Sequence, residues 1–145
     1  MTLIEVTDYS GNVIELDWLM KAERVHRQLR PMLPEDYAAR LRQVFSNGAR
    51  MLLAVNGDKV VGVAVWRLIE NTYEGLRLYV DDLVTDDNER SKGIGKALLQ
   101  QLEVKARDFG CNVLTLDSGV QRAAAHKFYF REGMHIPSYC FRKSL

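Results

Sequence analysis

The sequence predicts an α/β fold in which a mixed central β-sheet of about six to seven strands carries helices on both faces. Two observations predict this fold class. An Asn-Gly turn lies between two β-rich runs in the first half of the chain, which is typical of an antiparallel hairpin. In the second half a strand, a glycine-containing loop, an amphipathic helix and another strand follow one another, which indicates a right-handed parallel crossover.

The first half of the chain is expected to supply two helices and most of the antiparallel strands. Apolar residues recur at helical spacing in two stretches, and Pro31 and Pro34 separate them. Asn56-Gly57 is the strongest short-range hairpin signal in the sequence. The expected elements are a strand at 2–6, helices at about 15–29 and 35–46, and hairpin strands at 51–55 and 60–69.

The second half contains the stretch from Asp81 to Leu99, around which the chain is organised. It reads as the end of a strand, an acidic turn, a loop with Gly93 and Gly95, and the first turn of a helix. Amides that open a helix have no partners inside it, so they can donate to phosphate oxygens. The expected elements are a strand at about 76–85, a helix ending at Gly110, a strand at 113–116 and a helix at about 122–131, before the chain finishes in residues 139–143.

Composition excludes several classes of partner. The net charge is +1 and basic and acidic residues are interleaved, so we expect no nucleic-acid partner. No apolar run approaches the roughly 20 residues that span a bilayer, and the first residues lack the pattern of a signal peptide, so we expect no membrane partner and a cytoplasmic location. Cys111 and Cys140 lack CxxC spacing and clustered histidines, which favours free thiols and no metal site.

Two motifs resemble one enzyme family. Arg90-x-x-Gly93-x-Gly95 resembles the pyrophosphate loop of the GNAT N-acetyltransferases, which bind acetyl-CoA, and Phe128-Tyr129-x-x-x-Gly133 follows it at the family's usual distance. With the hairpin and the helix lengths, the resemblance extends from about residue 50 to the C-terminus. The chain looks most like small bacterial amine acetyltransferases, aminoalkylphosphonate N-acetyltransferases among them.

The resemblance implies a single GNAT domain over residues 1–145, with the GNAT fold and with acetyl-CoA as cosubstrate. It implies that the two early helices line the acceptor site. Carried over by position, the pantetheine arm would lie along Leu83, Val84 and Thr85, and the pyrophosphate would take the amides of Arg90, Ser91, Lys92, Gly93, Ile94, Gly95 and Lys96. The chain departs from the family at Ser91, where a glycine is common, and at Gly119, where many members have an asparagine that contacts pantetheine.

Two residues are candidates for proton transfer. Tyr129 matches the residue expected to protonate the CoA sulfur, and a phenol with a pKa near 10 suits a thiolate of about the same basicity. Its alternative role is a packing aromatic beside Phe128 and Phe130. Asp82 matches an acidic position of several small-amine members and is the candidate base, but it could also cap the strand end or bind the acceptor's cation. Asp81 is expected to face the other side of the strand.

Three residues are candidates for contact with the acceptor, namely Arg67, Arg77 and Asp81. Arginine on a central strand can bind a phosphonate or carboxylate with two hydrogen bonds, and ordinary surface pairing is the alternative. His126 lies one helical turn before Tyr129, where it could relay a proton or could be structural.

The leading function is acetyl transfer to a primary amine of a small molecule. One alternative keeps this chemistry but takes a protein N-terminus or lysine as acceptor. Another is a CoA-binding sensor without turnover, against which the proton donor Tyr129 argues. Dimerisation is common in the superfamily, so a homodimer is a possible assembly of this chain.

Overall fold

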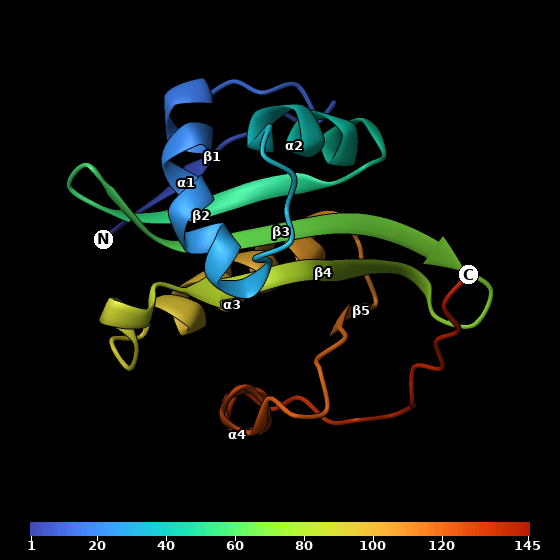
Figure 1. Ribbon diagram of the computed structural model, residues 1–145. Helices are drawn as coiled ribbons and strands as arrows, with labels where there is room; N and C mark the ends of the chain where they lie inside the picture. Colours follow the sequence, from blue (N-terminus) through green and yellow to red (C-terminus); the bar gives the residue numbers. More distant parts are fainter. The chain divides into compact units, whose positions relative to one another are not determined.

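A five-stranded sheet with the order β1-β2-β3-β4-β5 forms the frame of the protein (Figure 1). The computed structural model describes all 145 residues, which fall into two units, Met1–Thr115 and Leu116–Leu145. The elements are β1 Thr2–Glu5, α1 Leu16–Leu29, α2 Tyr37–Ser46, β2 Arg50–Asn56, β3 Lys59–Asn71, β4 Gly75–Thr85, the 3-10 helix η1 Asp87–Glu89, α3 Ile94–Asp108, β5 Val113–Leu116 and α4 Ala123–Arg131.

The α/β class is confirmed, but the expectation of about six to seven strands is wrong, because the sheet has five. A strand needs a neighbour for its backbone hydrogen bonds and a face that it can bury. Residues 134–145 belong to no helix or strand, and residues 135–145 are all exposed. The aromatic C-terminal residues therefore add no strand to the sheet.

The predicted hairpin is confirmed as the pair β2 and β3. Asn56 pairs with Lys59, so Gly57 and Asp58 form the two-residue turn, one position later than the Asn-Gly pair itself. Gly57 has a φ of 59°, in the left-handed region that such turns require and that glycine adopts without steric cost. The ladders β1–β2 and β3–β4 are also antiparallel.

Helices α1 and α2 cover one face of the sheet, as Figure 1 shows, and pack on the inward side chains of β2 and β3. Both helices are amphipathic, because their buried residues recur at helical spacing. The core on this face is formed by Val6, Leu19, Ala22, Val25, Tyr37, Leu41, Phe45, Ala49, Met51, Leu53, Val55, Val60, Val63, Val65 and Val84.

Helix α3 packs on the opposite face, close to the backbone of β3. A Cβ atom at Gly62 would lie 2.7 Å from Ile94 Cγ2 and 2.9 Å from Leu98 Cδ1, so only glycine allows this approach. The helix ends as predicted, with Gly110 at a φ of 75° and a hydrogen bond from the Cys111 amide to the Ala106 carbonyl. Since α3 joins the neighbouring strands β4 and β5, the glycine loop follows the carboxyl end of β4.

The second unit contains α4 and the C-terminal residues. None of its α4 side chains is fully buried. In neither unit does a helix combine the length and apolar character of a membrane-spanning segment.

Candidate active site

Strand β4 carries a β-bulge at Asp81. Val65 of β3 pairs with Asp82 and the next residue, Trp66, pairs with Val80, so Asp81 has no partner in the ladder. An extra residue resets the alternation of side chains along a strand. The expectation that Asp81 and Asp82 face opposite sides is therefore wrong, and both carboxylates find partners on the side of α1 and α2.

Asp82 is the centre of a hydrogen-bonded chain that joins β4 to both early helices. Its Oδ2 lies 2.7 Å from His26 Nε2, and its Oδ1 accepts a 2.7 Å hydrogen bond from Arg30 Nε. His26 Nδ1 lies 2.8 Å from the Tyr37 hydroxyl at the start of α2. His26 is 2% exposed, while the Asp82 side chain keeps 14% of its surface open. We call Tyr37, His26, Asp82 and Arg30 the Asp82 network.

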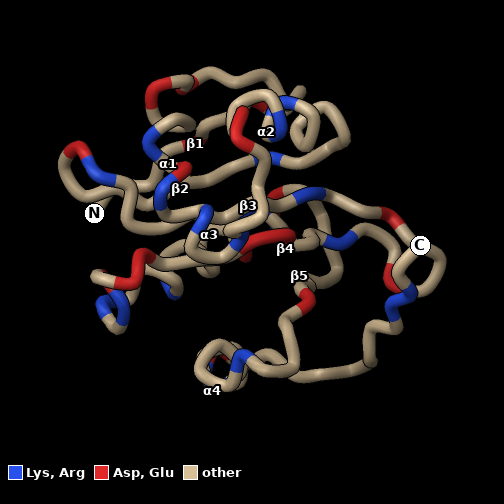
Figure 2. The backbone as a smooth tube through the Cα atoms, viewed as in Figure 1, with Lys and Arg blue, Asp and Glu red and all other residues tan.

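Asp81 is held separately, by an arginine of β3. Arg67 Nε donates to Asp81 Oδ2 at 2.8 Å, and Nη2 lies 2.7 Å from the same oxygen in an ion pair. Its Nη1 donates to the carbonyl of Asn47 at the end of α2. Arg30 Nη2 also donates to the Asp81 carbonyl. Each carboxylate at the bulge thus has its own arginine, and Figure 2 shows acidic positions on β4 with basic positions on neighbouring segments.

The two carboxyl groups are perturbed in opposite directions. Burial by itself raises the pKa of Asp82, but the hydrogen bond to His26, together with the charge and hydrogen bond of Arg30, outweighs it and holds the pKa below the ordinary value of 3.8. Burial raises the pKa of Asp81, and Arg67 opposes this rise only in part. Asp82 is therefore the more firmly ionised carboxylate at neutral pH.

His26, Tyr37 and Arg30 were absent from the candidates that the sequence suggested. Their contacts to Asp82 and to one another span 11 to 56 residues, so no local motif contains them. One signal was available, because His26 lies on the apolar face of α1 with Leu19 and Ala22. A buried histidine on such a face needs a polar partner.

Arg77 lies near the start of β4, four residues before the bulge at Asp81. Its guanidinium carbon stacks 5.6 Å from the centre of the Tyr79 ring, and its buried Nε has no hydrogen-bond partner. The register pairs Arg77 with Ile69 and Tyr79 with Arg67. Alternation on the ladder therefore places Arg77, Tyr79 and Arg67 on the face that carries the Asp82 network.

The last residues of β4 have one edge that β5 does not cover. Leu83, Val84 and Thr85 pair with Ala64, Val63 and Gly62 of β3. On the other side, the Asn112 amide donates to the Leu76 carbonyl, which marks where β5 begins beside β4. A strand of four residues spans only about 13 Å, so it stops short of the end of β4.

The loop before α3 is shaped as an anion site. Ser91 has a φ of 64° and Gly93 a φ of 80°, so two left-handed residues turn the chain into the helix. No side chain caps α3, and no hydrogen bond within the protein uses the amides from Arg90 to Lys96. These free amides and the helix dipole suit a pyrophosphate, so the loop fits the group that the sequence predicts for it.

Tyr129 lies on α4 in the second unit. The centre of its ring lies 5.5 Å from the centre of the Phe128 ring. Burial raises the pKa of the Tyr129 hydroxyl, and Arg122 partly opposes this rise. His126 has structural partners in the same unit, with Nε2 2.8 Å from the Gly119 carbonyl and 3.1 Å from Ser118 Oγ.

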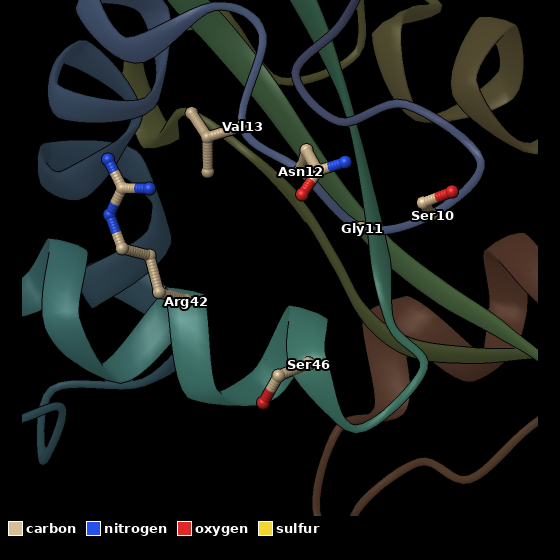
Figure 3. A pocket seen from close by; sticks show the side chains of 6 residues that line it. All are labelled: Ser10, Gly11, Asn12, Val13, Arg42 and Ser46. Carbon is tan, nitrogen blue, oxygen red and sulfur yellow. The ribbon is translucent and has the colours of Figure 1, made fainter.

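A hollow of about 430 Å³ lies elsewhere on the first unit (Figure 3). Its lining comes from the loop between β1 and α1 and from α2, namely Ser10, Gly11, Asn12, Val13, Arg42 and Ser46. It contains no member of the Asp82 network and no residue of the glycine loop. We therefore do not expect this hollow to be the active site.

Comparison with known proteins identifies relatives of this chain. Residues 13–134 match the Acetyltransferase (GNAT) family. The uncharacterized N-acetyltransferase YhdJ of Bacillus subtilis is 37% identical over 111 residues, which cover 75% of this chain and 78% of that protein. The aminoalkylphosphonate N-acetyltransferase of Salmonella typhimurium is 35% identical over 66 residues, which cover 46% of this chain and 43% of that protein.

A solved structure has the same fold at lower identity. The crystal structure of an aminoglycoside acetyltransferase from an uncultured soil metagenomic sample, in complex with trehalose, has a TM-score of 0.80 and 19% identity, and the match covers 99% of this chain and 95% of that chain.

The fold, the free amides before α3 and these relatives define the protein as an acyltransferase. The chain belongs to the acetyltransferase (GNAT) family, whose match covers most of its length. The resemblance seen in the sequence is thereby confirmed, and acetyl transfer is the activity of the class.

Proposed function

We propose that the protein transfers an acetyl group from acetyl-CoA to the primary amine of a small molecule, with the acceptor bound at the bulge of β4. The observation that carries this proposal is the bulge itself, because it turns two carboxylates toward α1 and α2 just before the loop of free amides. The family match runs across the boundary between the two units, which supports one acetyltransferase domain over residues 1–145.

The residues proposed to hold acetyl-CoA are those at the uncovered end of β4 and in the loop. Backbone groups of Leu83, Val84 and Thr85 would hold the pantetheine arm, and the amides from Arg90 to Lys96 would hold the pyrophosphate. When bound, acetyl-CoA supplies an activated thioester. Ser91 fits the loop despite lacking the usual glycine, since it already adopts a left-handed backbone conformation.

Asp82 is proposed as the base that receives a proton from the acceptor amine. An ammonium like that of lysine has a pKa near 10.4 and an ordinary aspartic acid one near 3.9, so direct transfer costs about 9 kcal/mol. The lowered pKa of Asp82 makes this transfer harder still. Asp82 is therefore proposed to bind the ammonium and to accept its proton only in passing, as the proton moves on to solvent through the partly open side chain.

Tyr129 is proposed as the acid that protonates the departing sulfur. Burial raises its pKa, so the hydroxyl keeps its proton at neutral pH until a strong base such as a thiolate is released. The family motif around Phe128 and Tyr129 supports this role.

The acceptor is proposed to be a small amine that also carries an anionic group. Arg67 and Arg77 project from the face of the bulge, and the unpartnered Nε of Arg77 is a donor without an acceptor. Asp81 would take part in the acceptor site together with Arg67, with which it forms an ion pair. The relative that acts on aminoalkylphosphonates supports this class, while the structural relative named for aminoglycosides makes polycationic amines the second candidate.

Thiol release from acetyl-CoA tests the proposal. The protein is incubated with aminoalkylphosphonates, amino acids, aminoglycosides, polyamines and short peptides, each beside a blank without acceptor, and the acetylated product is identified by mass. Release with an anionic amine supports the proposal. Release only with peptides would favour the protein N-terminus or lysine alternative, and acetyl-CoA binding without any release would favour the sensor.

A further inference from the structure

The innermost member of the Asp82 network is Tyr37, which is 1% exposed. Burial, aided by the charges of Glu23 and Asp82, raises its pKa far above the ordinary value of 10, so its hydroxyl keeps its proton. The atom available to accept that proton is His26 Nδ1, at 2.8 Å. A buried hydroxyl proton requires such an acceptor.

This contact fixes where the proton of His26 lies. If Tyr37 donates to Nδ1, then Nδ1 carries no hydrogen, and the imidazole proton is on Nε2. Nε2 then donates to Asp82 Oδ2 at 2.7 Å. The opposite tautomer would leave the Tyr37 proton without an acceptor and would turn a lone pair of Nε2 toward an ionised carboxylate.

We infer that His26 and Tyr37 are positioning residues for the acceptor amine, in a one-way chain of donors that runs from Tyr37 through His26 to Asp82. The inference rests on the proposed function of Asp82. A carboxylate accepts about four hydrogen bonds, and His26 and Arg30 occupy one position on each oxygen. The remaining positions of this fixed carboxylate face the acceptor's ammonium.

The direction of the donors also determines where a proton can go. Every donor of the chain points toward Asp82, so a proton that reaches Asp82 has no empty acceptor further inside. It leaves through the open 14% of the Asp82 side chain, past Arg30, whose side chain is 53% exposed. His26 therefore orients the base and is not itself the next carrier of the proton.

Two near-isosteric variants separate this role from packing. Glutamine at position 26 can place an amide N–H close to the position of Nε2 and still donate to Asp82, whereas asparagine reaches only the position of Nδ1. His26→Asn is expected to lower kcat/KM for the amine by about 10- to 100-fold, mainly through KM. His26→Gln is expected to stay within about fivefold of the wild type, and KM for acetyl-CoA is expected to be unchanged in both.

The matched control is Val25→Ala on the same helix. Val25 is fully buried and is not part of the network, so this variant loses packing without loss of a donor to Asp82. Thermal melts of all three variants establish that each is folded. Equal amine kinetics for His26→Asn and His26→Gln, or the same rise in KM for Val25→Ala, would overturn the inference.

Nitrogen NMR of histidine-labelled protein tests the direction of the donors without any turnover. The chain has three histidines, and His26→Gln assigns the signal of interest. A protonated Nε2 and an unprotonated Nδ1 are expected, and the reverse tautomer or a doubly protonated ring would overturn the inference. If no amine is acetylated by the wild type, the proposed function fails, whereas a wild type that acetylates an amine but carries the reverse tautomer fails only the inference.

Discussion

Replacing Asp82 by asparagine separates the charge of this residue from its shape. The two oxygens of Asp82 each accept one hydrogen bond at 2.7 Å, from His26 and from Arg30. An asparagine has only one oxygen, so its amide group must face one of these donors. Loss of one hydrogen bond to this largely buried side chain costs about 1–3 kcal/mol of folding free energy. We expect Asp82→Asn to lose about that amount at neutral pH, measured by urea unfolding.

The pH dependence of this loss follows from the pKa of Asp82. An acid whose pKa is lower in the folded state stabilises the protein above its unfolded pKa, and this stability disappears as the pH falls through the folded value. The difference in unfolding free energy between wild type and Asp82→Asn should therefore be constant at neutral pH. It should shrink below about pH 4.

Turnover measures the second role of Asp82. Loss of a proton acceptor typically lowers rates by about 10²- to 10⁴-fold, so kcat for amine acetylation should fall by that factor in Asp82→Asn. Steady-state thiol release at saturating acetyl-CoA measures it. If only KM for the amine rises while kcat stays at the wild-type value, Asp82 anchors the ammonium and is not the base.

Asp81→Asn is the matched control, since it removes the same charge one residue away. Burial raises the pKa of Asp81, so its ionised form is disfavoured in the folded state and this penalty grows as the pH rises through its folded pKa. The neutral asparagine avoids the penalty, and its loss of stability at neutral pH should be smaller than that of Asp82→Asn. Indistinguishable unfolding and kinetic profiles for the two variants would refute the assignment of separate roles.

Three further predictions concern the acid, the helix contact and the loop. Tyr129→Phe should lower kcat by about 10²- to 10⁴-fold with little change in the calorimetric affinity for acetyl-CoA, and unchanged turnover would remove Tyr129 from the mechanism. Gly62→Ala should destabilise the protein by about 1–3 kcal/mol in thermal or urea unfolding, since its Cβ would lie 2.7 Å from Ile94 Cγ2. Gly93→Val should weaken calorimetric CoA binding at least about tenfold, because a β-branched residue is strained at a φ of 80°; unaltered affinity would exclude this loop as the pyrophosphate site.

The sequence predicted those parts of the fold that local chemistry determines. The turn at Gly57, the end of α3 at Gly110 and the amphipathic helices each depend on a few neighbouring residues, and the structure has them close to the expected positions. The number of strands was overestimated, because pairing requires an available edge that no local pattern in residues 139–143 reveals.

The site was predicted only in part, for the same reason. Asp81, Asp82 and the residues of the loop could be proposed from the sequence because they lie in one continuous motif. The bulge depends on the register of β3 against β4, which is a property of the paired strands and not of β4 alone. His26 and Tyr37 join Asp82 only through the packing of α1 and α2 on the sheet, so these contacts became visible only with the tertiary structure.

The most direct test of the account is a crystal structure with a bisubstrate ligand in which CoA is joined through an acetyl bridge to the nitrogen of the best amine. The account predicts pyrophosphate oxygens on the amides between Arg90 and Lys96, the bridge beside Leu83 and Val84, and the amine nitrogen within hydrogen-bond distance of Asp82 or of a water held by it. An amine placed away from the bulge, for example over the hollow lined by Arg42, would contradict it.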